Sequence, residues 1–211
     1  MIMEAGGRSL AAVAFHREGD MQPMRSADAI DDPVLIELHA FWRSRFVGAR
    51  PPSRRDIDPS SLGKLLQWVF LIDVGRDPPS LRYRLIGTGI TRFLGRDFTG
   101  RMIDEENYGD AAPEMRRIFF SAVEKRDVTA ARGRVFYAPT HCFLGFCCAI
   151  MPLSSDGSTI DMLFCGYAAE PPEKILDDPT LQGALRAKII LDPVFEKAKD
   201  RKVKRPTPAN P

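Results

Sequence analysis

The order of strand-like and helix-like segments is the feature that most constrains the fold of this chain. Two strand-like segments come first, residues 68–74 and 81–85. The first is rich in aromatic and β-branched residues, and the second alternates between apolar and polar residues. Helical patterns follow, and three strand-like segments then come in succession, at about 128–137, 142–151 and 160–169. A strand pair, then helices, then three consecutive strands predicts a mixed α/β (α+β) fold. We expect a five-stranded antiparallel sheet with helices on one face.

The first two strand-like segments predict an antiparallel hairpin. Residues 77–80 (Asp-Pro-Pro-Ser) separate them and are typical of a turn. Apolar and polar residues alternate across residues 81–85, and side chains alternate between the two faces of a strand. We therefore expect Leu81, Tyr83 and Leu85 to share the buried face, with the two arginines between them facing out.

Helical patterns lie before and between the strands. Asp32-Pro33 is typical of an N-cap followed by a first helical residue. After it, apolar residues recur at helical spacing in one stripe, formed by Leu35, Leu38, Trp42 and Phe46. A short helix over residues 88–95 and a longer helix from Pro113 are expected between the strand pair and the last three strands. This pattern predicts flanking helices at the N-terminal and C-terminal ends of the sheet domain.

Composition divides the chain into three parts. Residues 1–31 lack a clear period and predict a flexible N-terminal arm, with a short helix near residues 10–15. Residues 32–170 form the predicted domain. Residues 171–211 predict a C-terminal helical extension and a basic tail. The basic residues of this tail are Lys197, Lys199, Arg201, Lys202, Lys204 and Arg205.

Charge and hydropathy exclude several classes of protein. Apolar residues make up 44% of the chain, which is enough for a hydrophobic core. The formal net charge of +2 gives no strong overall attraction to nucleic acid or to a membrane surface. The densest apolar run, residues 142–153, is too short to span a bilayer and contains Pro152. We expect a cytoplasmic protein with no membrane partner.

Several short motifs carry a family resemblance. They lie at residues 52–59, 71–74, 82–88 and 95–100, and Trp42 in the first predicted helix also fits. In this order they resemble a PAS-like domain family, formerly catalogued as a domain of unknown function and found chiefly in alphaproteobacteria. The resemblance covers about residues 33–170. It implies a bacterial sensory or signalling module, and we find no kinase, cyclase or regulator sequence attached to it.

The resemblance also implies where a ligand would bind. PAS domains bind small ligands between the sheet and the helices, or contact partners through the sheet and flanking helices. The candidate pocket-lining residues are Tyr83, Leu85, Ile90, Phe93, Phe98, Ile118, Phe119 and Phe146. The same aromatic and aliphatic residues could instead fill a packed core, because hydrophobicity alone does not reveal a cavity.

Two cofactors common in PAS domains are disfavoured, and the ligand stays unknown. No histidine falls in residues 88–126, the expected helical wall of the pocket, so a haem ligand is absent there; His141 at a strand entrance is the alternative left open. A LOV-type flavin photosensor needs a cysteine near residues 95–98, and this region has none. Flavin binding without a cysteine adduct is left open, but no residue pattern supports it.

Catalytic and metal motifs are also missing. No Gly-x-Ser-x-Gly elbow is present, and Gly87-Thr88-Gly89 lacks the third glycine of a dinucleotide loop because Arg92 occupies that position. Cys147 and Cys148 are adjacent in a predicted strand, so their thiols face opposite ways and do not converge on a metal. We expect a non-catalytic protein without a metal site.

Three kinds of partner remain open. The stripe of Leu35, Leu38, Trp42 and Phe46 lies outside the predicted sheet domain, so it either packs on its own sheet or pairs with a second copy; we favour a homodimer through it. A regulatory protein bound by the sheet or this helix is an alternative. Nucleic-acid binding by the basic tail is disfavoured, because no aromatic residues interleave with the charges.

Overall fold

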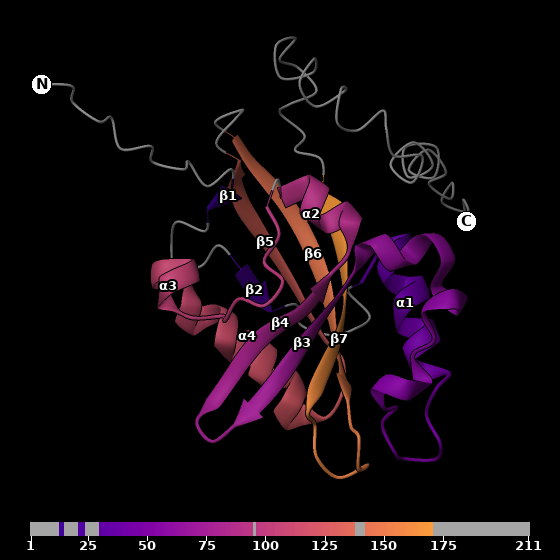
Figure 1. Ribbon diagram of the computed structural model, residues 1–211. Coiled ribbons are helices and arrows are strands. Elements are labelled where there is room, and N and C mark those ends of the chain that lie inside the picture. The colour runs from indigo at the N-terminus through magenta and orange to yellow at the C-terminus, as the bar shows by residue number, and fades with distance from the viewer. Residues whose placement is uncertain (1–12, 15–20, 24–29, 95, 138–141, 171–211) are drawn as a thin grey trace, which may run out of the picture. The chain divides into compact units, whose positions relative to one another are not determined.

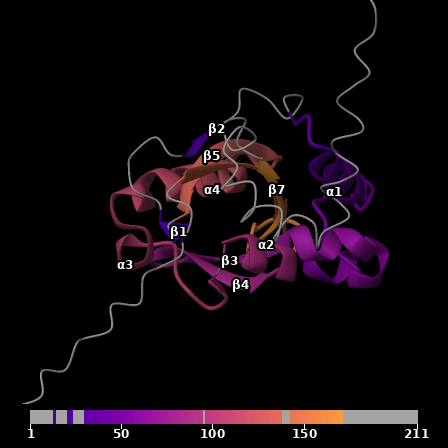
Figure 2. The same ribbon diagram turned by 90° about the horizontal axis from the view of Figure 1, so that it is seen from above.

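The computed structural model describes residues 13–14, 21–23, 30–94, 96–137 and 142–170. These residues form a curved antiparallel sheet with helices on both faces (Figure 1). Seen from above, α4 lies on the inner side of the curved sheet and α1 on the outer side (Figure 2). We call these two sides the inner face and the outer face.

Five strands make up the body of the sheet. They are β3 (Val69–Arg76), β4 (Pro79–Ile86), β5 (Thr129–Tyr137), β6 (Cys142–Leu153) and β7 (Met162–Glu170). Their spatial order is β5-β6-β7-β3-β4, and every neighbouring pair is antiparallel. The last strand, β7, inserts between β6 and β3, so the strand pair and the strand triplet join into one sheet. The predicted five-stranded antiparallel sheet is confirmed.

Two short strands of the N-terminal arm extend the sheet to seven strands. Both β1 (Val13–Ala14) and β2 (Met21–Pro23) pair antiparallel with β5. The helix expected near residues 10–15 is therefore wrong at residues 13–14. Without the arm, β5 would be an edge strand with unpaired backbone N–H and C=O groups, and pairing satisfies them. At the end of the predicted arm, Ile30 is buried in the outer cluster and Asp31 forms an ion pair with Arg132. The other residues of the arm lie outside the described residues.

A β-bulge changes which residues of β4 face inward. Leu71 pairs with Leu85 while the next residue of β3, Ile72, pairs with Tyr83, so Arg84 is the extra residue on β4. Side chains alternate again beyond the bulge, and Leu85 therefore shares the outer face with Leu71. Leu85 is 40% exposed. The expectation that it shares a buried face with Leu81 and Tyr83 is wrong because of this one-residue insertion.

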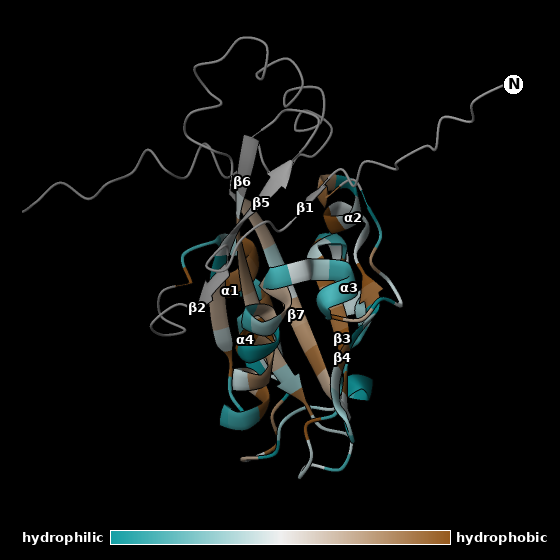
Figure 3. Cartoon of the chain, turned by 90° about the vertical axis from the view of Figure 1, so that its left-hand side faces the viewer, coloured by the Kyte–Doolittle hydropathy of each residue, from teal (hydrophilic) through white to brown (hydrophobic). Residues whose placement is uncertain are grey.

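Helices of the predicted middle region cover the inner face. They are α2 (Thr88–Leu94), α3 (Glu105–Tyr108), the 3-10 turn η4 (Gly109–Ala111) and α4 (Ala112–Lys125). Helix α4 packs on β5 and β6 and buries one apolar stripe, formed by Met115, Ile118, Phe119 and Ala122. In Figure 3 the side of α4 turned to the viewer is mostly hydrophilic, whereas the strands behind it are more hydrophobic.

The outer face is covered by α1 (Pro33–Arg43) and by the 3-10 segment η3 (Pro59–Trp68), which follows the 3-10 turn η2 (Arg54–Asp56). Asp32 caps α1, as expected, and accepts hydrogen bonds from the backbone N–H groups of Val34 and Leu35. The helix ends at Arg43, so Phe46 lies beyond it. The predicted N-terminal flanking helix thus forms a second helical layer. The predicted C-terminal helices lie outside the described residues.

Candidate functional site

Aromatic side chains gather on the inner face, between the sheet and α2–α4. The sheet contributes Phe70, Tyr83, Phe146 and Tyr167, and the helices and the loop between α2 and α3 contribute Phe93, Phe98, Tyr108 and Phe119. All except Phe93 are buried, and Phe93 is partly buried. Their ring contacts divide them into two groups, which we call the tyrosine-pair group and the α2 group.

The tyrosine-pair group is centred on Tyr83 of β4. The centroid of its ring lies 6.1 Å from that of Phe70, 6.2 Å from that of Phe98 and 6.4 Å from that of Tyr108. The rings of Phe98 and Tyr108 stack at 5.8 Å, and Phe119 of α4 meets Phe70 edge-on at 6.3 Å. Edge-on and offset stacked contacts at these separations are favourable for aromatic pairs. This group therefore ties β3 and β4 to α3 and α4.

The α2 group lies over β6 and β7. The rings of Phe146 and Tyr167 stack at 5.2 Å with an interplanar angle of 12°. They come from diagonal positions of neighbouring strands, because Tyr167 pairs with Cys148, two residues beyond Phe146. Phe93 of α2 meets Tyr167 at 5.8 Å. These contacts hold α2 against the sheet.

A buried pair of hydroxyl groups lies inside the tyrosine-pair group. The Tyr108 hydroxyl donates to the Tyr83 hydroxyl at 2.8 Å. Burial raises the pKa of both phenols above the ordinary value, and for Tyr83 the neighbouring Tyr108 raises the pKa further. Both groups are therefore neutral near pH 7, and they form a polar contact among aromatic rings.

Two buried thiols lie on the same face. Burial raises the pKa of Cys148 and of Cys165, so both are neutral thiols near pH 7. Cys147 lies on the outer face, in a cluster with residues of α1, and it accepts a hydrogen bond from Arg132 Nε at 3.1 Å. The expectation that Cys147 and Cys148 face opposite ways is met by this arrangement.

Most of the candidate pocket-lining residues share the inner face. Those that are buried are Tyr83, Ile90, Phe98, Ile118, Phe119 and Phe146. Phe93 is partly buried and joins the α2 group, while Leu85 lies on the outer face. Sequence reasoning missed Phe70, Tyr108 and Tyr167. Tyr167 could have been found from alternation along β7, whereas Tyr108 belongs to a one-turn helix without a detectable period.

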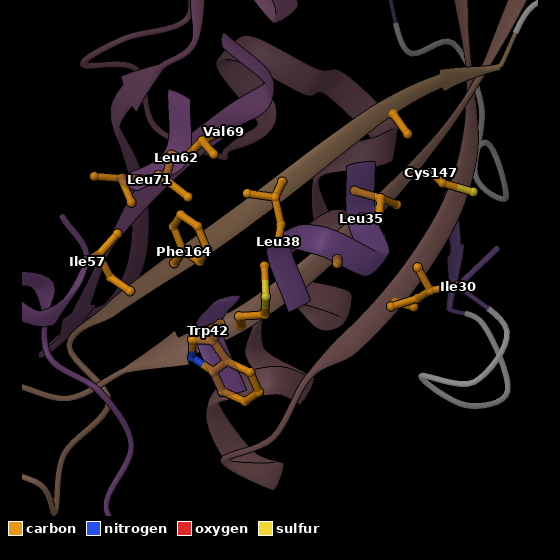
Figure 4. Close-up of a cluster of buried hydrophobic side chains, with 14 of the residues drawn as sticks. Ile30, Leu35, Leu38, Trp42, Ile57, Leu62, Val69, Leu71, Cys147 and Phe164 are labelled. Carbon is orange, nitrogen blue, oxygen red and sulfur yellow. The ribbon is translucent and has the colours of Figure 1, made fainter. Parts of the chain in front are cut away.

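Most of the residues expected to form a dimer interface are buried in the core of the chain itself. Leu35, Leu38 and Trp42 are at most 1% exposed and pack against the outer face of the sheet (Figure 4). Trp42 Nε1 donates to the carbonyl of Pro152 at 3.0 Å. Phe46 is partly buried and meets Trp42 edge-on at 4.8 Å. The assignment of this stripe to a partner interface is corrected, because its apolar surface is already covered.

One glycine explains why α1 lies so close to the sheet. A Cβ atom added at Gly166 of β7 would lie 2.7 Å from Leu38 Cδ1 and 2.9 Å from Leu35 Cδ2, closer than real Cβ contacts. Glycine at this position therefore makes room for the two leucines. The docking of α1 depends on a residue far away in the sequence.

Within the described part of the chain, no cluster of three histidine, cysteine or acidic residues is arranged to hold a metal ion. No helix described there is long and apolar enough to cross a membrane. His39 stacks on Trp42 at 5.9 Å, and His16 and His141 lie outside the described residues.

Comparisons with known proteins identify the family of the chain. A family model described as a PAS domain matches residues 30–166. No curated protein matches the chain. A similar solved structure is a LOV protein of Rhodobacter sphaeroides, 14% identical, matched over 64% of this chain and 82% of that one with a TM-score of 0.40. Since the family model spans more than half of the sequence, the chain belongs to the PAS domain family.

Proposed function

We propose that this PAS domain is a non-catalytic sensory module that binds a small ligand between the inner face of its sheet and helices α2–α4. The family model that matches residues 30–166 describes a PAS domain, and PAS domains are in general sensory or signalling modules. The observation that carries the ligand proposal is the buried hydroxyl pair of Tyr83 and Tyr108. Binding sites for small molecules are mostly apolar, with a few polar groups that fix the orientation of the ligand.

The surroundings of the pair define the chemistry of the ligand. Both phenols are neutral, and the side chains that contact them through their rings are aromatic and uncharged. A charged ligand would lose its hydration among these rings, and the charged side chains that act on Tyr108, namely Arg96, Arg101 and Asp104, are of both signs. We therefore propose a neutral ligand with a planar or apolar body and one hydrogen-bonding group for the tyrosines.

The same pair connects a ligand to the helices. Tyr83 belongs to the sheet, whereas Tyr108 ends α3, which leads through η4 into α4. A ligand acceptor that takes the Tyr108 O–H in place of the Tyr83 oxygen breaks the bond between the two tyrosines. The position of α3 relative to β4 then depends on occupancy, which is a physical route from binding to a signal.

A thermal-shift screen of neutral aromatic and apolar compounds tests this proposal. A ligand at a hundredfold excess over its Kd stabilises the native state by about 2.7 kcal/mol, which raises the Tm of a domain of this size by roughly 5–10 °C. The shift should shrink in Tyr83→Phe and persist in Ile36→Ser, because Ile36 is 51% exposed on α1. A stabilising compound whose shift is equal in both variants would place the binding site elsewhere.

A second candidate function is the binding of a regulatory protein. It is favoured by the exposed side chains of Arg82, Arg84 and Leu85 on the outer face of the β3–β4 hairpin. The predicted homodimer remains a further candidate, although it would have to use surfaces other than the buried stripe of α1.

A further inference from the structure

The outer face of the β3–β4 hairpin is only partly covered. Leu71 of β3 is buried in a cluster with Ile57 and Leu62, whereas Leu85 of β4 is 40% exposed. Helix α1 packs on β6 and β7, and η3 packs on β7. On this face Leu71 pairs with Leu85. The next pair of residues whose side chains face outward is Asp73 and Arg82. The following pair is Gly75 and Ser80, whose side chains are small. The β4 side of this surface, with Arg82, Arg84 and Leu85, is therefore accessible from outside.

The bulge at Arg84 brings a leucine and an arginine together on this surface. Arg84 Nη1 donates to Asp73 Oδ1 at 3.2 Å, so its side chain points to the outer face. Leu85, the next residue, also lies on this face, because it pairs with Leu71. Regular alternation would have turned one of these neighbours inward. A bulge that re-aims a side chain in this way is typically a functional feature of a sheet.

The charge of this surface is positive. Arg82 Nη2 donates to Asp73 Oδ2 at 3.1 Å, so two guanidinium groups share one carboxylate. The side chains of Arg82 and Arg84 are 56% and 55% exposed, whereas Asp73 is 23% exposed. A guanidinium has five N–H donors, and the bond to Asp73 occupies few of them. The outward-facing donors are suited to the carboxylates of a partner.

We propose that Arg82, Arg84 and Leu85, which we call the Arg–Leu face, bind an acidic amphipathic segment of a partner protein. Leu85 contacts an apolar side chain of that segment, and the two arginines bind carboxylates beside it. A second copy of this chain fits less well, because two-fold pairing would set like-charged arginine surfaces against each other. The inference rests on the proposed function, since a sensory module acts by passing its signal to another protein or domain.

Site-specific photocrosslinking in the cells that naturally make the protein tests this inference. The full chain carries p-benzoylphenylalanine in place of Leu85, and a control chain carries it in place of Ile36, which is also exposed. The expected product, formed only from position 85, joins this chain to a segment rich in Asp and Glu beside an apolar residue. The product should be lost when Arg82→Gln and Arg84→Gln are added.

A synthetic peptide with the cross-linked sequence then gives the energetics by fluorescence anisotropy. We expect Leu85→Ser, and separately Arg82→Gln with Arg84→Gln, to weaken binding at least tenfold, while Ile36→Ser leaves it unchanged. Replacing the Asp and Glu residues of the peptide by Asn and Gln should weaken binding to a similar degree. Raising the salt concentration should also weaken it, because the arginines are exposed.

Several outcomes would overturn the inference. They are a cross-link to another copy, a cross-link to residues 171–211 of the same chain, a cross-linked segment without acidic residues, and no cross-link from position 85. Ligand binding is measured separately by thermal shift. If a ligand binds at the tyrosine pair but position 85 gives no acidic cross-link, only this inference fails and the sensory function stands.

Discussion

Individual residues set the chemistry of the inner face. Tyr83 and Tyr108 satisfy each other in a layer where an unpaired hydroxyl is costly. Alternation along the strand predicted that Tyr83 is buried. Its partner could not be predicted, because the pairing joins residues that are 25 positions apart and Tyr108 lies on a helix of four residues. The sequence therefore predicts half of the polar pair.

The energetic link between the two tyrosines can be measured with a double-mutant cycle. Tyr108→Phe leaves the buried Tyr83 hydroxyl without this partner, so we expect a loss of about 1–3 kcal/mol in the free energy of unfolding. Removing both hydroxyls should cost less than the sum of the two single changes. Urea unfolding of the four proteins checks this. Strictly additive losses would contradict a direct bond between the hydroxyls.

The ion pair between Glu105 and Arg116 makes stability depend on pH. Arg116 donates to both carboxylate oxygens, at 2.5 Å and 3.0 Å, and lowers the pKa of Glu105 from 4.5 to about 2. A carboxyl whose pKa is lower in the folded state contributes stability above its unfolded pKa. That contribution is lost as the pH falls from about 4.5 to about 2.

Glu105→Gln should therefore lose less stability than the wild-type chain between pH 5 and pH 2. Thermal unfolding at a series of pH values measures the difference, and Glu106→Gln, the exposed neighbour, is the matched control. A Glu105→Gln curve parallel to that of the wild type would mean that the ion pair does not contribute. The pair joins α3 to α4, so it also supports the position of Tyr108.

At the scale of elements, sequence reasoning gives the order of strands and helices but not every partner. The strand pair, the helices and the strand triplet follow from periodicity and turn signals. The bulge at Arg84 does not, because residues 81–85 alternate without interruption in the sequence and only pairing with β3 reveals the extra residue. Strands β1 and β2 pair through backbone groups, which need no apolar pattern. The sequence therefore predicted an arm without the strands β1 and β2.

The docking of α1 is the element-scale feature that the sequence left open. A stripe of Leu35, Leu38 and Trp42 fits either a core or an interface, and the answer depends on Gly166 in the last strand. Gly166→Ala should lower the free energy of unfolding by about 1–3 kcal/mol, because the added methyl group overpacks the contact with both leucines. Chemical denaturation measures this loss.

A second substitution separates local overpacking from a general effect on β7. Leu38→Ala alone should cost about 2–5 kcal/mol. Combined with Gly166→Ala it should cost less than the sum, since the shortened side chain vacates the space that the methyl group enters. Ile36→Ala on the exposed side of α1 should show no such coupling. Equal coupling in both pairs would contradict the proposed contact.

At the scale of the whole molecule, a sheet with two helical layers separates two tasks. The inner layer, with its hydroxyl pair, is proposed to bind a ligand, and the exposed β3–β4 surface is proposed to bind a partner. Sequence resemblance and the family match agree on a PAS domain. The identity of the ligand cannot be read from the sequence, because the same aromatic residues serve a packed core and a pocket equally well.

Native mass spectrometry of the chain purified from the cells that make it, with a parallel denatured run, is the decisive test of ligand binding. We expect a native mass larger than the chain mass by that of a small neutral molecule, which is released on denaturation. Tyr83→Phe should lower its occupancy, and Ile36→Ser should leave it unchanged. Identical masses in the two runs, together with no stabilising compound in the thermal-shift screen, would contradict the ligand-binding function and leave the inner layer as packed core.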